Sequence, residues 1–339
     1  MRLGSVLALA GAIALVAGAA RADDNKIAIV VGGPHPYYAS MEVAAADVKK
    51  QFDIGEVDYR VPQAWDVAQQ NKLIESLVSS GSQAFLLSPG DPVGSITMMN
   101  ELKDAGIPSA VMAGCVSDPS PALFCMATDV YASAYQGTKH LIEAMGGKGN
   151  IVHFTGLFAD SNTQLRIKGV EDAVKETNGA VTLVQTIADI DSPQPADEKI
   201  NAYLAADGAK TDGIVTTAWT PAVVASTSLR NLGDKRIKMV AIDHDPIVLA
   251  AIKDGFVNGT MLQNPYGQAF LGTYVMDKLL NGCKIKDGAP FAKTAQTARF
   301  IDTGTLFVDG SQVDKYVDGL KTLTDGLRGK LDSDFLTCS

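Results

Sequence analysis

Two histidines of this chain follow apolar runs, where side chains can act as acids, as bases or as hydrogen-bond partners. His35 follows an apolar run near the start of the chain. His244 lies between Asp243 and Asp245, directly after the apolar run 238–242. A carboxylate that orients a histidine makes a general base when a nucleophile lies beside it. The same groups also bind ligands by hydrogen bonds, so other patterns must separate catalysis from binding.

The motifs that mark catalysis, phosphate binding or metal binding are absent from the sequence. It contains no GxSxG nucleophile turn and no GxGxxG or GxxxxGKS/T phosphate loop. Gly32 and Gly33 are expected to let the chain turn sharply, but Pro34 and Pro36 remove N–H groups that a phosphate cradle needs. The histidines show neither HxH nor HxxxH spacing, and no CxxC pair occurs. We therefore expect no catalytic residue, no cofactor and no metal site.

Polar side chains follow most of the apolar runs. In open parallel α/β sheets, ligands bind beyond the carboxyl ends of the strands, so these residues are the first candidates for a site. Amides, hydroxyls, carboxylates and aromatic rings together suit a neutral, hydroxyl-rich ligand, because its hydroxyls need donors and acceptors and its C–H faces need aromatic cover. The candidates at these positions include His35, Tyr37, Tyr38, Ser88, Asp129, Asp189, Asp191, Trp219, Asp243 and Gln263.

A repeating strand–helix pattern, which runs from residue 26 to about 280, must position these residues. Runs such as 27–31 and 84–88 are apolar throughout, whereas intervening segments such as 64–79 repeat apolar residues at helical spacing. Apolar strands linked by helices predict parallel sheets covered on both faces. One sheet of ten or more strands is unusual, so we expect two doubly wound α/β lobes. The tail predicts a strand or two and then a helix near 311–329.

The overall charge argues against two classes of partner. The 339-residue chain has a formal net charge of −9 and no basic run. Binding to nucleic acid needs clustered Lys and Arg to neutralise phosphates, so we expect no nucleic-acid partner. The lack of a polybasic patch also argues against an anionic lipid surface.

The first 22 residues predict a targeting segment. Arg2 gives a positive start, residues 3–20 are uncharged, and Ala20-Arg21-Ala22 fits the small-x-small cleavage rule. We expect a signal peptide that is cleaved after Ala22, so that the mature chain is exported. A membrane anchor is the alternative reading, because these 18 uncharged residues approach the length of a span.

All four cysteines lie after the predicted cleavage site, where an oxidising compartment favours disulfides. Cys115 and Cys125 would close a short loop whose Asp-Pro-Ser-Pro centre is typical of a turn. Cys283 and Cys338 would then pin the C-terminal tail. Four unpaired, buried thiols are the alternative.

Six segments, in order and with matching spacing, resemble the periplasmic sugar-binding proteins of the ribose-binding type, the solute receptors of ATP-binding-cassette (ABC) importers. The resemblance covers about residues 25–295. HPYYASM at 35–41 resembles that family's Asn-Pro-Phe-Phe turn, and VAIDHDP at 240–246 is similar to its Gly-Phe-Asp turn. The other four segments are AFLLSPGDPVGSI (84–96), MATDVYASAYQG (126–137), SNTQLRIKGV (161–170) and GTMLQNPYGQAFLG (259–272).

The resemblance implies a role for several residues. Tyr37 and Tyr38 would flank the ligand. Asp243 would accept hydrogen bonds from ligand hydroxyls, and Gln263 would bond another hydroxyl near the hinge. The remaining ligand-binding candidates are His35, Ser88, Asn162, Gln164, Arg166, Trp219 and His244, and the hinge candidates are Thr128, Asp129 and Asn264.

Three departures from the family pattern argue against ribose itself. Gln164 stands where the ribose binder has a sugar-binding Arg, and Ala113-Gly114 stands where that family has an Asp. Ala218-Trp219 replaces an Asn-Asp pair. Because charged clamps are missing and Trp219 adds an aromatic face, we expect another pentose, a deoxy sugar or a linear polyol.

The implied fold is that of a type I periplasmic binding protein, with two lobes joined by crossovers near Thr128, Asn264 and Thr294. The implied mechanism is hinge closure over the ligand, followed by delivery to an ABC permease in the inner membrane by a monomeric receptor. A periplasmic enzyme acting on a sugar and a receptor that presents its ligand to a membrane sensor are the alternatives. The expected units are 23–127 with 264–294 for the N-terminal lobe, 128–263 with 295–310 for the C-terminal lobe, and 311–339 for a final helix and tail.

Overall fold

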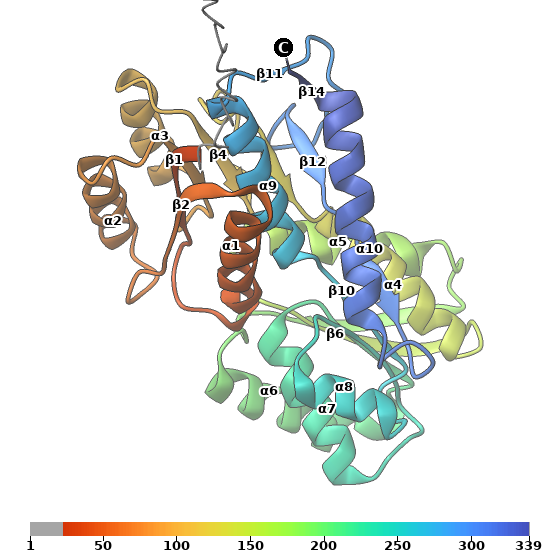
Figure 1. Cartoon of the computed structure of the whole chain (residues 1–339). Coiled ribbons are helices and arrows are strands. Elements are labelled where there is room, and N and C mark those ends of the chain that lie inside the picture. The colour runs from red at the N-terminus through yellow and green to blue at the C-terminus, as the bar shows by residue number, and fades with distance from the viewer. Residues whose placement is uncertain (1–22, 339) are drawn as a thin grey trace, which may run out of the picture.

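Two sheets, each packed between helices, divide the protein into two lobes (Figure 1). The computed structural model describes residues 23–338. The predicted signal peptide at 1–22 therefore lies outside the described residues. The two doubly wound α/β lobes that the sequence predicts are confirmed.

Lobe 1 is built around a six-stranded sheet in the order β12-β5-β4-β3-β1-β2, in which all strand pairs are parallel. Its strands are β1 (Asp23–Val30), β2 (Ile54–Arg60), β3 (Ala84–Leu87), β4 (Ser109–Met112), β5 (Cys125–Ala127) and β12 (Phe300–Asp302). Its helices are α1 (Ala39–Phe52), α2 (Val67–Ser79), α3 (Gly94–Asp104) and α9 (Pro265–Leu280), and the short 3-10 helix η1 (Pro36–Tyr38) precedes α1.

Lobe 2 repeats this plan with a six-stranded sheet in the order β13-β10-β9-β8-β6-β7, in which only the β10–β13 pair is antiparallel. Its strands are β6 (Gly149–Phe154), β7 (Val181–Ile187), β8 (Gly213–Thr216), β9 (Lys238–Ile242), β10 (Gly259–Leu262) and β13 (Leu306–Val308). Its helices are α4 (Val130–Ala144), α5 (Ser161–Lys175), α6 (Pro193–Asp207), α7 (Trp219–Leu232) and α8 (Pro246–Lys253).

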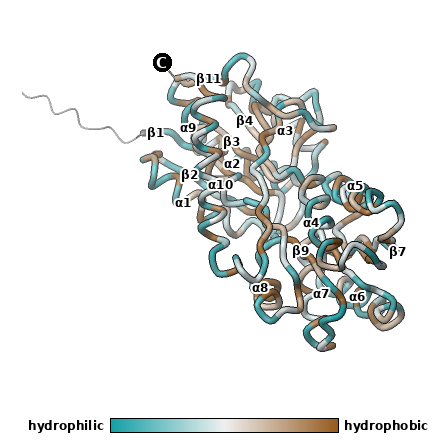
Figure 2. The backbone as a smooth tube through the Cα atoms, turned by 90° about the vertical axis from the view of Figure 1, so that its right-hand side faces the viewer, coloured by the Kyte–Doolittle hydropathy of each residue, from teal (hydrophilic) through white to brown (hydrophobic). Residues whose placement is uncertain are grey.

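Alternating strand residues feed two separate cores, one on each face of a sheet. In lobe 1, Ile27 and Ile29 of β1 pack into the core beneath α1 and α9, whereas Ala28 and Val30 pack into the core beneath α2 and α3. Successive side chains of a strand point to opposite faces, so a strand covered on both sides must be apolar throughout. The inner strands β3, β4, β8 and β10 are therefore buried from end to end, whereas the edge strands β2 and β7 are only partly buried. Figure 2 shows hydrophobic and hydrophilic stretches alternating along both lobes.

The chain passes between the lobes at three places: after β5, after β10, and between β12 and β13. The first two lie where Thr128 and Asn264 are expected. The third differs from the expected crossover near Thr294. Phe300–Asp302 pairs with Cys125–Ala127 and extends the sheet of lobe 1, so residues 295–302 do not belong to lobe 2. The crossing occurs at 303–305, where Gly304 adopts a φ of 75° that favours glycine.

Helix α10 (Tyr316–Lys330) lies across both lobes, beside α9 (Figure 1). Near its start, Tyr316 and Leu320 pack against the core of lobe 2. Near its end, Leu327 packs against the core of lobe 1. Between these contacts, Thr324 Oγ1 accepts a hydrogen bond of 3.0 Å from Asn264 Nδ2 at the second crossover. The helix therefore contacts the hinge and both bodies that the hinge joins.

Both expected disulfides are present, Cys115–Cys125 and Cys283–Cys338. The second ties the end of α9 to the C-terminal tail, where β11 (Lys284–Ile285) and β14 (Leu336–Thr337) form a small antiparallel pair. Within residues 23–338, the helices are all too short or too polar to cross a bilayer.

Candidate functional site

The carboxyl ends of the strands in the two lobes face each other, and side chains from both lobes meet there. His35 of lobe 1 lies against two residues of lobe 2. Its Nε2 is 3.9 Å from Asp191 Oδ2, and its ring centroid is 6.4 Å from that of Trp219. The name interlobe cluster is used below for His35, Tyr37, Arg166, Asp191, Trp219, Asp243 and Gln263.

The turn after β1 sets the lobe 1 side of the cluster. Pro36 begins η1, and His35 caps it, because His35 Nδ1 accepts a hydrogen bond of 3.2 Å from the Tyr37 backbone N–H. The cap fixes the direction of the imidazole, and η1 presents Tyr37 and Tyr38 on successive positions.

The two glycines before this turn have a different role from the one expected. Neither Gly32 nor Gly33 has a positive φ, so a sharp turn does not require them. A Cβ at Gly32 would lie 2.6 Å from the Trp65 ring and 2.8 Å from Gly90 Cα, and one at Gly33 would lie 2.7 Å from the Trp65 ring. The glycines are needed because Trp65 lies directly on the backbone.

The two tyrosines have different partners. The Tyr37 hydroxyl donates to Gln268 Oε1 at 3.0 Å, and the Tyr38 hydroxyl pairs with Ser88 Oγ at 2.8 Å. Burial, followed by the Asp243 carboxylate, raises the pKa of Tyr37 well above its ordinary value. Burial also raises the pKa of Tyr38 to about 12. Both hydroxyls are therefore neutral, and Ser88 supports Tyr38 from within lobe 1.

Asp243 forms the acidic centre of the lobe 2 side. It follows β9 with a φ of 67°, a conformation that is unfavourable for a residue with a side chain and that collects at functional sites. Gln263 Nε2 donates to Asp243 Oδ1 at 2.9 Å. Burial raises the pKa of Asp243 to about 6, although the Gln263 hydrogen bond and the Arg166 charge act to lower it. The carboxyl is therefore an acceptor at neutral pH.

Arg166 lies at the electrostatic centre of the cluster. Its charge acts on His35, Tyr37 and Asp243 at once. Its Nη2 makes only a long contact of 3.5 Å with Gln263 Oε1, and its buried Nε has no acceptor among the described residues. The guanidinium thus retains donors that a ligand can use.

Trp219 supplies an aromatic surface on lobe 2. It is the first residue of α7, and its Nε1 donates to Asp245 Oδ2 at 3.0 Å. Its ring meets His35 on one side and His244 on another, with a centroid separation of 5.4 Å for the second pair. His244 lies between Trp219 and Tyr316 of α10. Trp219 is therefore held in place on three sides.

Two candidates from the first turn of α5 behave differently from the rest. Asn162 faces lobe 1, since its Nδ2 lies 3.9 Å from the position of a Cβ on Gly114. Gln164 is exposed, and its amide donates to the Phe158 carbonyl in the loop before the helix. The structure therefore does not bring Gln164 to the interlobe cluster, because its helix turns that side chain toward solvent.

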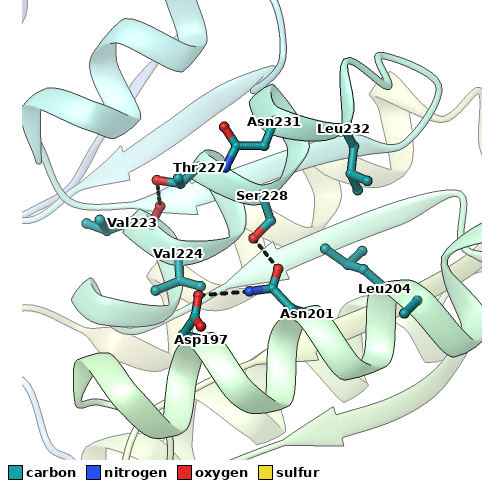
Figure 3. Close-up of a pocket in the computed structure, with 10 residues that line it drawn as sticks. Asp197, Asn201, Leu204, Val223, Val224, Thr227, Ser228, Asn231 and Leu232 are labelled. Carbon is teal, nitrogen blue, oxygen red and sulfur yellow. Dashed lines mark hydrogen bonds between the residues drawn. The ribbon is translucent and has the colours of Figure 1, made fainter.

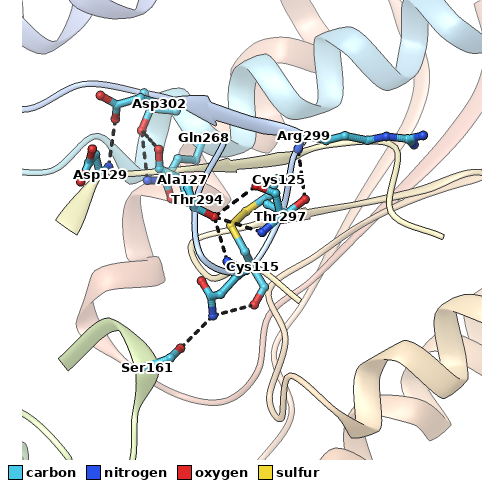
Figure 4. Close-up of a disulfide and its surroundings, with 12 residues drawn as sticks. Cys115, Cys125, Ala127, Asp129, Ser161, Gln268, Thr294, Thr297, Arg299 and Asp302 are labelled. Carbon is cyan, nitrogen blue, oxygen red and sulfur yellow. Dashed lines mark hydrogen bonds between the residues drawn. A yellow bond between two sulfur atoms is a disulfide. The ribbon is translucent and has the colours of Figure 1, made fainter. Parts of the chain in front are cut away.

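The hinge candidates tie the crossovers to their neighbours. Asp129 caps α4, and its backbone N–H donates to Asp302 Oδ1 at 3.0 Å (Figure 4). Asn264 caps α9. Gln268 Nε2 donates to Thr128 Oγ1 and Thr303 Oγ1, each at 3.2 Å. Since Gln268 also accepts from Tyr37, it joins the site to two crossovers.

A second contact between the lobes lies beside the Cys115–Cys125 disulfide (Figure 4). Gln296, in the segment that leads to β12, donates from Nε2 to Ser161 Oγ of lobe 2 at 2.9 Å. The same amide lies 3.5 Å from the Cys115 carbonyl oxygen. The lobes are thus in contact both at the interlobe cluster and beside the disulfide, and this arrangement is called the closed form below.

Two residues with contacts in this region were not among the expected ligand-binding or hinge residues. Asp191 follows β7 and was named only as one of the polar residues at the strand ends. Gln268 is a completely buried amide in α9, four residues after the hinge residue Asn264. A polar side chain within the apolar face of that helix was the available signal.

A groove elsewhere on lobe 2 has a different construction. It has a volume of about 370 Å³ and lies between α6 and α7 (Figure 3). Asn201 accepts from Ser228 Oγ and donates to Asp197 Oδ1, so its main polar groups bond one another. The groove contains no member of the interlobe cluster. In the part of the chain that the structure describes, no group of three or more His, Cys, Asp or Glu side chains is arranged to hold a metal ion.

Comparisons with known proteins identify the family. The family described as "Periplasmic binding protein domain" matches residues 27–284 of this chain. A xylitol-binding protein of Mycolicibacterium smegmatis is 28% identical to it over 261 residues, which cover 76% of this chain and 73% of that protein.

Solved structures share the fold. An ABC transporter solute-binding protein of Burkholderia graminis in complex with D-arabinose superposes with a TM-score of 0.74 at 20% identity, over 87% of this chain and 98% of that chain. One from Bacillus halodurans with bound myo-inositol superposes with a TM-score of 0.73 at 18% identity, over 88% and 98% of the two chains. The chain belongs to the periplasmic binding protein family.

Proposed function

We propose that this protein captures a neutral, pentose-sized sugar or polyol in the interlobe cluster by hinge closure. The observation that carries the proposal is the approach of His35 to Asp191 and Trp219 across the two lobes. The proposed lobes are the two sheets with their helices, and the proposed hinge residues are Thr128, Asp129 and Asn264. The captured ligand passes to an ABC permease of the inner membrane.

The chemistry of the cluster supports a neutral, hydroxylated ligand. Asp243 accepts hydrogen bonds, Arg166 donates them, and Trp219 and Tyr37 offer ring faces for C–H groups. The charges of Arg166 and the nearby carboxylates oppose one another, so no single charge on the ligand is selected. Relatives whose names mention xylitol, D-arabinose and myo-inositol support the same class of ligand.

The ligand favours closure because it contacts residues of both lobes only when the lobes are together. A ligand shifts a conformational equilibrium only by its difference in affinity for the two states. Hydrogen bonds to Asp243 of lobe 2 and packing on Tyr37 of lobe 1 are made together only in the closed form. Micromolar affinity corresponds to about 8 kcal/mol of binding free energy, which a few such bonds and aromatic contacts can supply.

We place the working protein in the periplasm as a monomer, after removal of residues 1–22. The two disulfides support export, because such bonds form and persist in an oxidising compartment. The same closed form could also present its ligand to a membrane sensor, and transport assays separate these two uses of one binding site.

A thermal-shift screen of residues 23–339 tests the proposal. The probes are xylitol, D-arabinose, D-ribose, D-allose and myo-inositol, each followed by calorimetric titration. We expect at least one pentose or pentitol to raise the melting temperature and to be recovered unchanged. Asp243→Ala should abolish the shift, whereas Asn201→Ala in the α6–α7 groove should keep it. The absence of a shift with every probe, or equal binding by Asp243→Ala, would contradict the proposal.

A further inference from the structure

A backbone hydrogen bond determines which ring nitrogen of His35 carries the proton. The protonated nitrogen is the one that faces lobe 2. Its Nδ1 accepts a hydrogen bond from the Tyr37 N–H, so this nitrogen carries a lone pair. The neutral ring must then carry its proton on Nε2. Nε2 is the atom that lies 3.9 Å from Asp191 Oδ2. His35 therefore presents an N–H donor toward lobe 2.

Asp191 is fixed in the same way from the other side. Its Oδ1 accepts a hydrogen bond of 3.2 Å from the Thr220 N–H in the first turn of α7. Ile190 beside it is completely buried in the core of lobe 2 and anchors the loop. Oδ2 is left facing His35. Asp191 therefore presents an acceptor toward lobe 1.

The gap between these two atoms is too long for a hydrogen bond and suits one oxygen atom between them. A separation of 3.9 Å exceeds the usual N–H···O range. An oxygen placed about 2.8 Å from each atom would accept from Nε2–H and donate to Oδ2. We propose that His35 and Asp191 hold one hydroxyl of the ligand between the lobes, and that Asp191 is a specificity-determining residue of the site. This inference rests on the proposed function.

The surroundings of His35 favour a neutral ring that donates a hydrogen bond over a charged ring that forms an ion pair with Asp191. Burial and the Arg166 charge lower the pKa of His35, while Asp191 acts to raise it. Tyr38 and Trp219 complete its surroundings with ring edges. The Nε2–H donor of His35 and the Oδ2 acceptor of Asp191 match the two ends of a hydroxyl, which both accepts and donates. A ligand that lacks this hydroxyl leaves both groups desolvated and unpaired.

Asp191→Asn separates this role from the structural one. The amide oxygen can still accept from the Thr220 N–H, while its NH₂ replaces the acceptor that faces His35. We expect the affinity for whichever of xylitol or D-arabinose binds the wild type to fall about 10- to 100-fold, because a charge-assisted bond is lost. Asp189→Asn is the matched control: it lies two residues away in the same loop, caps the Phe158 N–H, and should leave the affinity unchanged.

A double-mutant cycle with His35→Gln tests whether the two residues share one hydroxyl. We expect coupling: Asp191→Asn should cost much less affinity in the His35→Gln background, with melting temperatures equal to the wild type. Additive losses, or an Asp191→Asn affinity within twofold of the wild type, would overturn the inference and leave the proposed function intact if Asp243→Ala still abolishes binding. Failure of the wild type to bind any probe would overturn the proposed function itself.

Discussion

Trp219 of lobe 2 meets His35 of lobe 1 edge to face, at a ring-centroid distance of 6.4 Å and an interplanar angle of 83°. Trp219 is only 8% exposed in this closed form. The chain has one other tryptophan, Trp65, which is 52% exposed at the end of the loop after β2. The two indoles therefore differ in how lobe separation changes their exposure to solvent.

This difference makes Trp219 a reporter of closure. In a Trp65→Phe variant, ligand should reduce acrylamide quenching of the remaining indole, because closure places His35 against it. In the matched Trp219→Phe variant, quenching of Trp65 should stay high and nearly constant. Steady-state fluorescence with and without the sugar identified by the thermal-shift screen measures both. Equal protection of Trp65 and Trp219 would show that closure does not bury the predicted surface.

Asp243→Asn should stabilise the unliganded protein at neutral pH. Burial raises the pKa of Asp243 from 3.8 to about 6, so between these values the folded state binds more protons than the unfolded state. The unfolding free energy that this group contributes therefore rises as pH falls through about 6. Above pH 6 the ionised carboxyl costs up to about 3 kcal/mol, which Asn removes. Urea unfolding at pH 7.5 and pH 4.5 should show a large gain at the first pH and little at the second.

The same group predicts how binding depends on pH. Protonation of Asp243 below about pH 6 removes an acceptor for a ligand hydroxyl, so affinity should fall as the pH is lowered from 7.5 to 5. Asp243→Asn should bind weakly with a nearly flat profile over this range. Calorimetric titration at four pH values checks both. An unchanged wild-type affinity at pH 5 would remove Asp243 from the ligand contacts.

Gly32→Ala should destabilise lobe 1, although its φ allows a side chain. The new Cβ would lie 2.8 Å from Gly90 Cα and 2.6 Å from the Trp65 ring, and overpacking of this kind costs about 1–3 kcal/mol. Gly326→Ala in α10 is the control, because a Cβ there has nothing within 4 Å and Ala favours a helix by about 1 kcal/mol. Urea unfolding should show opposite signs for the two changes.

Much of the fold follows from local pattern. Apolar runs bounded by Gly, Pro and polar residues locate the strands, since a strand buried on both faces has no room for a charge. The third crossover was misplaced because it depends on a non-local choice. Phe300–Asp302 and Leu306–Val308 are both three-residue edge strands, and neither segment contains a sequence feature that indicates which sheet it joins.

For the site as well, the sequence predicts the features that depend on local pattern and does not predict those that depend on packing between distant segments. Strand ends pointed to His35, Tyr37, Trp219 and Asp243, because the topology places such positions at one edge of each sheet. Which face of a helix meets the other lobe is decided by packing between distant parts of the chain. In α5, Gln164 therefore turns to solvent, whereas Arg166, two residues later and on another face, reaches the centre of the cluster.

Helix α10 and its disulfide give the last prediction. The helix contacts both lobes and, through Thr324, the second crossover, while Cys283–Cys338 ties the tail that follows it to the end of α9. Replacing both cysteines by serine should lower the free energy of unfolding by about 4 kcal/mol, because the bond closes a loop of 55 residues.

The matched Cys115→Ser/Cys125→Ser variant should lose less, about 3 kcal/mol, since its loop spans only 10 residues. Hydrogen exchange tells the two losses apart. Freeing Cys338 should raise exchange first in the last turns of α10 and in β14, because that end is then held to lobe 1 only by the packing of Leu331, Phe335 and Leu336, the short β11–β14 pair and a few hydrogen bonds such as Tyr274 to Asp332. Unchanged exchange in α10 after loss of Cys283–Cys338 would mean that packing and hydrogen bonds secure the helix across the hinge without the disulfide.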